Sequence, residues 1–516
     1  MKIFFTALLS VMSTLSLAQS SLEITVYDRV TDAPLSQYAI TIENTSIGQV
    51  LTKNTDEQGK VKFQSLSTSG QYTIKTAETD GYYAFEKGGI AMKSNQLASI
   101  TILLNARSVV NLDEVVISGS NFSQINTVNA EVSAELTAKE IETLPIEGRD
   151  VTRVLYRLPN VTQATGFYPE APNVAINGAN SLFTNYLIDG LDNNENFLGG
   201  LKFNIPVGFT QNITVLANNY SAEYGNTANG IFNFTTKSGS NDFSGEAYYI
   251  LRPGTRELLG ITFDASSPLA QRDLSGNQVR DGFQRHQFGF GFGGPIVKDK
   301  TFYFVNVEHT SDLKDNLLNS PELGVNETVE GNNNFTYLSA KIDHKWNSRW
   351  NSSLRVNSGI VNIERQGGGL EGGVSFPSTG NQQDRNSLLI ANRNVFSNNN
   401  FFSETNLQFA RFRWDYANPD NPASPNVTVL NPNDQTIAVL GHPGFIFNSL
   451  EETYQLQQKF VYFKHNHTLK AGFDVISSDH TLLGGGNPNG SYTVRLNQSQ
   501  LDNLRAQKQA GLNSRP

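Results

Sequence analysis

The sequence predicts a mainly β protein: a small β-sandwich, then a compact α+β unit, then the long antiparallel strands of a transmembrane β-barrel. Three observations predict this fold class. An apolar run opens the chain, apolar and polar residues alternate over much of its length, and no later window is apolar enough for a helix that crosses a bilayer. Gly 43, Phe 32 and Tyr 18 are high counts, whereas only 17% of the residues are charged. An exported chain without a membrane helix can span a membrane only with strands.

Residues 1–18 are predicted to be a secretory signal peptide. Met1 and Lys2 precede an apolar run from Ile3 to Leu17, and the run ends in a small-x-small pattern suited to signal peptidase. The alternative is a transmembrane helix, but the run is shorter than the roughly 20 apolar residues that a bilayer requires. We therefore expect the exported chain to begin near Gln19.

Residues 19–105 have the pattern of a small β-sandwich. Apolar residues occupy every second position in short runs, for example from Leu22 to Val26 and from Ile100 to Leu104. Turn residues such as those from Asp56 to Gly59 separate the runs at the spacing expected of a small sandwich. We expect half-buried strands in two packed sheets.

Residues 106–120 form a linker, and residues 121–237 are predicted to form a compact α+β domain. The segment from Ala134 to Leu144 is expected to be a helix that stops at Pro145, and a second helical piece covers Val151 to Leu158. Pairs of turn residues then separate short apolar strands, which is typical of a globular domain with several exposed loops. These pairs are Asn177-Gly178, Asp189-Gly190 and Gly199-Gly200.

Residues 238–516 contain about nine long alternating segments, as expected for the wall of a barrel. Around Leu338 to Asp343, apolar residues alternate with polar ones that would point inward. A soluble all-β protein is the alternative, because its strands alternate as well. Polar stretches at 367–380 and 418–444 would be extracellular loops. The expected strands include Phe243 to Leu251, His286 to Phe292, Phe302 to Glu308, Phe335 to Trp346, Leu354 to Glu364, Phe402 to Tyr416, Tyr454 to Lys464 and Thr468 to Asp474.

Composition and motifs argue against several classes of function. Cys is 0, so neither disulfides nor thiolate metal sites can form, and the net charge of -9 argues against a nucleic-acid partner. No His-Glu-x-x-His zinc pattern, catalytic triad or phosphate-binding loop stands out. We expect a protein that is not an enzyme and has no resident cofactor.

Several segments, in their order along the chain, resemble those of one family, the TonB-dependent outer-membrane receptors. They are Leu144 to Asp150, Ile176 to Gly178, Leu187 to Asp192, Asn219 to Gly225 and Gly293 to Lys300. Residues 19–105 resemble the carboxypeptidase-regulatory-like domain, an immunoglobulin-like (Ig-like) β-sandwich that precedes many such receptors. The resemblance implies an outer-membrane location with the sandwich in the periplasm. It also implies a plug domain at 121–237 inside a barrel of about 22 strands.

The resemblance further implies coupling to the periplasmic protein TonB and its inner-membrane energising complex. The candidate coupling segment lies in the linker and consists of Asp113, Glu114, Val115, Val116 and Ile117. An extended β-branched segment of this kind can add itself as a strand to the sheet edge of a partner. The alternative is that these residues are only the first strand of the plug.

Two groups of polar residues are candidate binding sites. An oxygen-rich group on one loop could bind calcium or a hydroxylated ligand, although an Asp/Asn-rich turn is the simpler explanation. His465 and His467 share one face of a strand and could chelate a metal, or they are ordinary wall residues. The members of the oxygen-rich group are Asp189, Asp192, Asn193, Asn194 and Glu195.

The length of the strand-rich part suggests that this chain is a piece of a longer receptor. Residues 238–516 suffice for about half of the implied barrel, and the polar segment from Ser499 to Pro516 does not have the pattern of a closing strand. We expect energy-coupled uptake of a bulky nutrient: an oligosaccharide, a peptide or an iron chelate. Adhesion on the same scaffold without transport is the alternative, and a secreted soluble binding protein is a third. The expected contacts include outer-membrane lipid and the nutrient, with a surface lipoprotein as a further candidate partner.

Overall fold

The computed structural model describes residues 20–28, 31, 33–44, 49–66, 71–79, 81–92, 97–104, 132–144, 146–163, 174–252, 282–366, 374–398, 400–417, 422–442, 444–464 and 467–509. The predicted signal peptide and the candidate coupling segment from Asp113 to Ile117 lie outside these ranges. The expected domain boundaries near residues 105 and 120 therefore stay predictions. Within the ranges, no helix combines the length and the apolar character needed to cross a bilayer.

The N-terminal domain is a sandwich of a three-stranded and a four-stranded sheet. In the first sheet, β1 (Ser20–Asp28) lies between antiparallel β4 (Lys60–Leu66) and parallel β7 (Leu97–Leu104). Alternate apolar residues fill the space between the sheets, and Ile24, Phe63 and Ile74 are fully buried. The second sheet has the order β3 (Gln49–Asn54), β2 (Ala39–Asn44), β5 (Gln71–Thr76), β6 (Phe85–Ala91). The predicted β-sandwich is confirmed, while its carboxypeptidase-regulatory-like character stays a prediction.

The second domain, which we call the plug, is built on a five-stranded mixed sheet. Its central strands β11 and β14 run parallel, and the other pairs are antiparallel. A core that includes Tyr186, Phe209 and Phe232 fills one side of this sheet. The sheet order is β12 (Leu191–Asp192), β11 (Thr184–Ile188), β14 (Gly230–Thr236), β13 (Thr210–Asn218), β8 (Val132–Thr137). The remaining elements are β9 (Val161–Gln163), β10 (Val174–Ile176), α2 (Ala138–Thr143), η2 (Glu147–Arg149), η3 (Val151–Arg157), η4 (Ser181–Phe183) and η5 (Val207–Phe209).

The helix expected from Ala134 to Leu144 is only half correct. Its first residues belong to β8, which pairs with β13, and helix α2 begins after Thr137. Thr137 caps this helix: its hydroxyl oxygen accepts the Glu140 N–H, and the Glu140 carboxylate accepts the Thr137 N–H at 2.8 Å. A single turn of helix and a paired strand therefore replace the longer helix.

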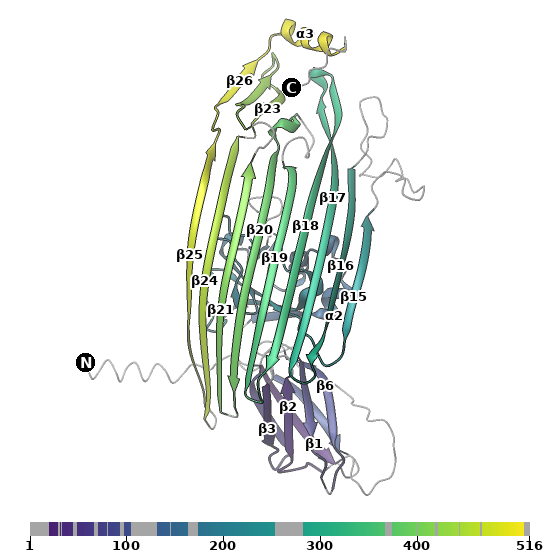
Figure 1. Ribbon diagram of the computed structural model, residues 1–516, viewed down its shortest axis with the longest axis vertical. Coiled ribbons are helices and arrows are strands. Elements are labelled where there is room, and N and C mark those ends of the chain that lie inside the picture. The colour runs from purple at the N-terminus through teal and green to yellow at the C-terminus, as the bar shows by residue number, and fades with distance from the viewer. Residues whose placement is uncertain are drawn as a thin grey trace, which may run out of the picture.

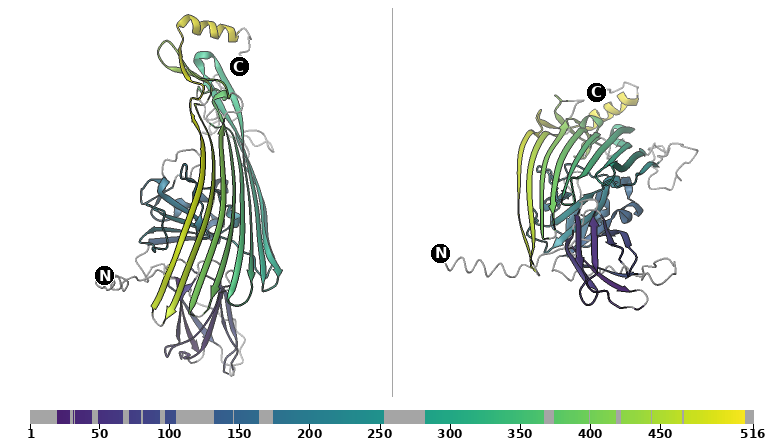
Figure 2. Two further views of the ribbon diagram at one scale, coloured as in Figure 1. Left: turned by 60° about the vertical axis from the view of Figure 1, so that its left-hand side comes forward. Right: turned by 60° about the horizontal axis from the view of Figure 1, so that its bottom comes forward.

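The third part, which we call the wall, is one curved antiparallel sheet of nine strands. Figures 1 and 2 show the sheet curving around the plug, with the sandwich next to one end of the strands. That end carries the short connections 298–300 and 346–349, so we call it the turn end, and the opposite end the loop end. In sheet order the strands are β15 (Ser244–Arg252), β16 (Gly282–Val297), β17 (Thr301–Ser320), β18 (Val325–Lys345), β19 (Trp350–Gln366), β20 (Asn381–Ser397), β21 (Phe401–Ala417), β24 (Phe445–Lys464) and β25 (His467–Gly486).

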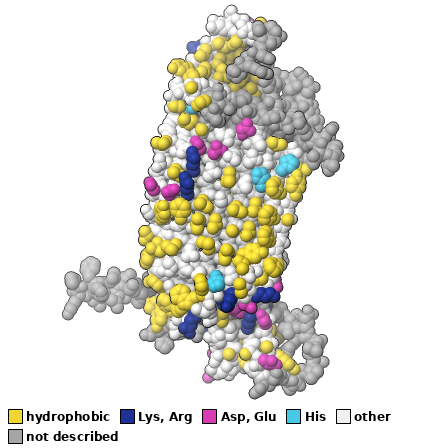
Figure 3. Space-filling view, viewed as in Figure 1, with side chains coloured by type: hydrophobic (Ala, Val, Ile, Leu, Met, Phe, Trp, Pro, Cys, Tyr) yellow, Lys and Arg dark blue, Asp and Glu magenta, His cyan; other side chains and the backbone are white. Residues whose placement is uncertain are grey.

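The two faces of the wall differ in chemistry, as the alternation predicts. Leu338 and Ile342 are each 42% exposed on the outer face. Ser339 and Lys341, which lie between them in the chain, are buried on the inner face. Figure 3 shows apolar side chains gathered in a band across the outer face. Such a band is what contact with hydrocarbon requires.

A small subdomain, which we call the cap, stands beyond the loop end of the wall. Its sheet has the order β23 (Thr436–Gly441), β22 (Asn426–Leu430), β26 (Ser491–Arg495), and α3 (Gln498–Gln509), η6 (Pro321–Leu323) and η7 (Pro377–Thr379) complete it. Val429, Ala438 and Leu501 form its core. The loop expected at 418–444 thus contains strands, because apolar residues scattered among Asn and Pro share one core with Leu501 of α3.

Candidate functional site: the contacts between plug and wall

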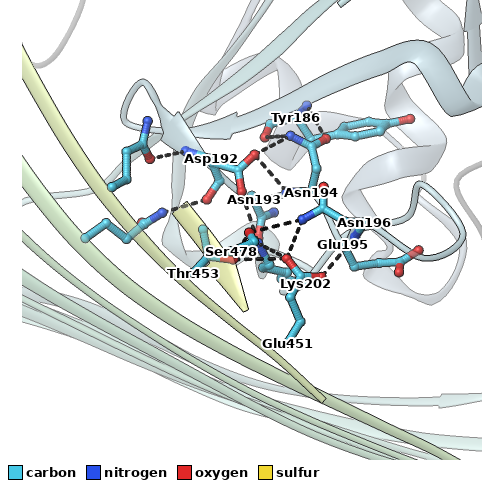
Figure 4. Close-up of polar contacts among 12 residues, drawn as sticks. Tyr186, Asp192, Asn193, Asn194, Glu195, Asn196, Lys202, Glu451, Thr453 and Ser478 are labelled. Atoms are coloured by element: carbon cyan, nitrogen blue, oxygen red, sulfur yellow. Dashed lines mark hydrogen bonds and ion pairs between the residues drawn. The ribbon is translucent and has the colours of Figure 1, made fainter. Parts of the chain in front are cut away.

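Lys202 of the plug makes the most deeply buried polar contact with the wall. Its ammonium group lies 3.1 Å from Asp192 Oδ2 and 2.9 Å from Glu451 Oε1, and it donates to Thr453 Oγ1 at 3.0 Å. The Lys202 side chain is 0% exposed. Because an ammonium group has three donors, these three acceptors satisfy it completely. Figure 4 shows the group, in which Glu451 and Thr453 come from β24. We call it the Lys202 anchor.

The loop that carries Lys202 is shaped by the polar residues that precede it. The Glu195 carboxylate accepts the backbone N–H groups of Phe197, Leu198 and Gly200 at 2.8–2.9 Å. Burial raises the pKa of Glu195, and the three N–H donors oppose that rise. Asn193 holds the other side of the loop through both its amide atoms, which bond the backbone of Phe203. The loop is therefore a preformed structure.

Asn196, at the tip of the same loop, adds a second link to β24. Its backbone N–H donates to Glu451 Oε2 at 3.0 Å, and its side-chain amide donates to Glu451 Oε1 at 2.5 Å. Glu451 thus binds the loop at two points at once, through Asn196 and through Lys202 (Figure 4).

Asp189 forms a second anchor nearer the turn end of the wall. It occupies the tight turn between β11 and β12, where Asp189 and Gly190 both have positive φ, a conformation that Asp-Gly pairs favour. Its carboxylate accepts the Thr236 N–H at 2.9 Å and Arg355 Nη1 of β19 at 2.7 Å. Burial alone raises the pKa of Asp189. The charges of Lys341 and Arg355 and the bonds from Thr236 outweigh burial and hold that pKa at about 2.

Arg149 forms a third anchor against β15 and β17. Its guanidinium lies 3.5 Å from Glu308 Oε1 and 4.0 Å from the ring centre of Tyr248. The same Glu308 oxygen accepts the backbone N–H of Gly208 at 2.9 Å. A Cβ at position 208 would displace the Glu308 carboxylate and the Asn306 amide, so glycine allows this close approach without moving either group. The three anchors together hold the plug against strands from β15 to β24.

The structure places the residues of the predicted oxygen-rich group in the plug. Asp189 belongs to the second anchor, and Asp192 belongs to the Lys202 anchor. Asn193 and Glu195 shape the loop that carries Lys202. Asn194 is bonded within the plug, where its amide donates to Asn185 Oδ1 and Asp192 Oδ1, both at 2.7 Å. Over the described residues, no three His, Cys, Asp or Glu side chains are grouped to hold a metal ion. Binding of calcium or another ligand by this group stays a prediction.

The wall side of the anchors was not predicted from the sequence. Glu308, Arg355 and Glu451 occupy inward positions of strands. At such positions the alternation predicts a polar residue but does not indicate which residue it contacts. Alternation alone could have flagged them as inward charges. For the histidine pair, His467 begins β25 and His465 lies outside the described residues.

Comparison with known proteins identifies two domains in the chain. The family described as TonB-dependent Receptor Plug Domain matches residues 123–231. The family described as Outer membrane beta barrel domain matches residues 235–321. The two matches meet at the passage from plug to wall.

Relatives and solved structures agree with these matches. The chain is 23% identical over 551 residues to the TonB-dependent transporter Oar of Myxococcus xanthus, which covers 91% of this chain and 51% of the relative. It is 28% identical over 282 residues to the vitamin B12 transporter BtuB of Vibrio vulnificus (strain CMCP6), with 52% of this chain and 40% of that protein covered. The crystal structure of the outer membrane transporter YddB from Escherichia coli has the same fold, with a TM-score of 0.52 at 16% identity, over 71% of this chain and 50% of that one.

The chain thus spans about half the length of the relatives it matches. Its plug, its curved antiparallel wall and the order of the two are those of one outer-membrane family, as the sequence motifs predict. Residues 123–231 are thus a TonB-dependent receptor plug domain, residues 235–321 belong to an outer-membrane β-barrel domain, and the chain is similar to TonB-dependent transporters over most of its length.

Proposed function

We propose that this protein takes part in TonB-dependent uptake of a bulky nutrient across the outer membrane. The observation that supports it is the seat of the plug on the inner face of the wall through three polar anchors. A plug in this place blocks the lumen, so passage of a large solute requires the plug to move or rearrange. The outer membrane has no nucleotide supply of its own, and the work must come from a partner.

The anchors are suited to a plug that is held and then released. They consist of ion pairs and hydrogen bonds, and because Cys is 0 no disulfide ties the plug to the wall. Water can replace each polar partner once the interface opens, so displacement has no permanent chemical cost. Breaking a buried ion pair is nevertheless costly while the interface stays dry. A pulling partner would therefore meet resistance at defined points.

In this proposal the segment from Asp113 to Ile117 pairs with an edge strand of TonB, in the manner of strand addition. Barrels of this kind have short periplasmic turns and longer outer loops, so the turn end and the sandwich would face the periplasm. Glu43 of the sandwich contacts Lys345 at the turn end at 3.3 Å. The coupling segment follows the sandwich in the chain and would start on the same side as TonB.

Deletion of residues 113–117 from the chromosomal gene tests the proposal. We expect growth on the nutrient that needs this receptor to be lost, while the amount of receptor in the outer membrane stays unchanged. Deletion of residues 106–110 shortens the same linker equally and is the matched control, which should keep growth. A panel of single oligosaccharides, peptides and ferric chelates identifies the nutrient. If growth on every nutrient that needs the gene survives the 113–117 deletion, coupling through this segment is wrong, and adhesion without transport becomes the better explanation.

A further inference from the structure

The inner face of the wall carries a group of aromatic side chains near its loop end, which we call the mouth cluster. It consists of Phe412, Trp414, Tyr416, Phe445 and Phe447 from β21 and β24. The Phe447 ring centre lies 5.1 Å from that of Trp414 and 5.2 Å from that of Tyr416, with which it stacks. Phe445 is 46% exposed, so the cluster has an accessible side.

The plug touches the mouth cluster through the loop of the Lys202 anchor. Phe197, at the tip of that loop, packs edge-on against Phe447 with ring centres 5.1 Å apart. Its neighbour Asn196 bonds Glu451, which also holds Lys202. A molecule that settles on the mouth cluster would therefore meet the part of the plug that is fixed most firmly to the wall.

Gln383 of β20 lies beside the mouth cluster, and its side-chain amide makes no hydrogen bond to the described residues. It pairs in register with Tyr416 of β21, is 0% exposed, and among the described residues neither its Nε2 nor its Oε1 has a hydrogen-bond partner. Two strands away, Asn333 of β18 is also buried, and its Oδ1 has no partner in the part of the chain that the structure describes. Ile363 of β19 lies between them in the same row. Buried amides without partners are rare because they lose hydrogen bonds to water and gain none.

The charged groups of the same region are already engaged. Arg285 donates to Asp312 Oδ2 at 2.7 Å, and the guanidinium of Arg385 lies 5.4 Å from the ring centre of Trp414. This part of the inner face combines aromatic side chains with the buried amides of Gln383 and Asn333, which can both donate and accept.

We propose that Gln383 and the mouth cluster form a subsite for a neutral sugar ring of an oligosaccharide. The C–H groups of such a ring carry partial positive charge and fit the negative face of an aromatic ring. Its hydroxyl groups both donate and accept, which matches the Gln383 amide. The subsite combines apolar walls with a few placed polar groups, as ligand sites do. This inference rests on the proposed uptake function, because it names the class of nutrient.

The subsite can be tested with the purified full chain in detergent, with Trp414 as its own reporter. The chain has Trp 3, and the other two, Trp346 and Trp350, are at the turn end, so a Trp346→Phe, Trp350→Phe background isolates Trp414. The probes are neutral glucan, mannan, xylan and galactan oligosaccharides, with neutral peptides and ferric chelates as comparison. We expect a saturable change in Trp414 emission with at least one oligosaccharide. Gln383→Ala should weaken that binding roughly tenfold.

Gln382→Ala is the matched control, since Gln382 is the next residue of the same strand and points to the opposite face. It should bind as the parent does. Gln383→Glu keeps the size of the side chain and guards against a folding artefact, and it should also weaken binding. The proposal is overturned if no oligosaccharide alters the emission, if only peptides or chelates do, or if Gln383→Ala and Gln382→Ala bind alike. Binding in detergent needs no TonB, so failure here leaves the deletion test of coupling unaffected.

Discussion

Lys202 is the residue whose chemistry depends most on its partners. Its ammonium is enclosed with the carboxylates of Asp192 and Glu451, and each group would be unfavourable there without the others. The same residue type at the surface would contribute little, because water screens exposed pairs. Because the three groups are buried, any position of the plug that separates them leaves unpaired charges, and the anchor therefore favours one position of the plug.

Replacement of this side chain should loosen the plug locally. Lys202→Met keeps the length of the side chain but leaves two carboxylates facing each other, and such losses cost about 3–5 kcal/mol. We expect the free energy of opening for the backbone amides between Asn193 and Phe203, measured by hydrogen exchange, to fall by that order.

Lys237→Met is the control for this change. Lys237 pairs with Glu142 at 2.9 Å, and the Glu142 side chain is 46% exposed. The Lys237 side chain is 16% exposed, but water reaches its carboxylate partner, so loss of this pair should change stability by less than about 1 kcal/mol. Equal effects of the two substitutions would mean that the Lys202 anchor does not fix the loop.

Asp189 gives the plug a defined dependence on pH. Its folded pKa of about 2 lies below the ordinary value of 3.8, so the charged form stabilises the fold. That contribution is complete above about pH 4 and is lost as the pH falls toward 2, and its size is on the order of 2 kcal/mol. We expect the titration of Asp189 to leave the free energy of unfolding in urea nearly unchanged between pH 7 and pH 5. Below pH 4 the parent should lose stability that an Asp189→Asn variant never had, and parallel curves for the two would contradict the assignment.

At the scale of elements, the strands of the wall are longer than their side-chain pattern suggests. The segment expected from Thr468 to Asp474 is the first part of β25, which continues to Gly486. Beyond Asp474 the alternation fades into Val475, Ile476 and two serines. The strand continues because each residue pairs with β24, and backbone pairing does not require an apolar side chain.

The proposed uptake requires the loop of the Lys202 anchor to separate from the wall strands. Asn196 Nδ2 lies 3.4 Å from Ser478 Oγ of β25, and the chain has no other thiol that could interfere. We expect an Asn196→Cys, Ser478→Cys pair to form a disulfide with oxidant, to stop uptake of the nutrient, and to recover with dithiothreitol.

Each single cysteine variant is a control for this pair and should transport with or without oxidant. Mobility on a non-reducing gel after proteolysis reports whether the bond has formed. Full uptake by the fully cross-linked protein would show that this loop stays on the wall during transport.

For the molecule as a whole, the order of sandwich, plug and wall follows from local patterns and short motifs. Alternation predicted the inward position of Lys341, and turn pairs such as Asp189-Gly190 predicted the plug's loops. The anchors could not be predicted in this way. Lys202 and Thr453 are 251 positions apart in the chain, and nothing local in either segment indicates the other. Such pairs depend on how the plug is seated in the wall.

The fold of the cap determines how antibodies and phage proteins can recognise this protein at the cell surface. Its core and hydrogen bonds join segments near Ser320, Phe376, Ile437 and Leu501, and Arg505 of α3 pairs with Glu322 at 2.8 Å. An antibody or phage protein that binds the cap therefore recognises a discontinuous epitope, which is assembled from four stretches of the chain. Antisera raised against any one of these stretches as a linear peptide should fail to recognise the folded receptor on intact cells.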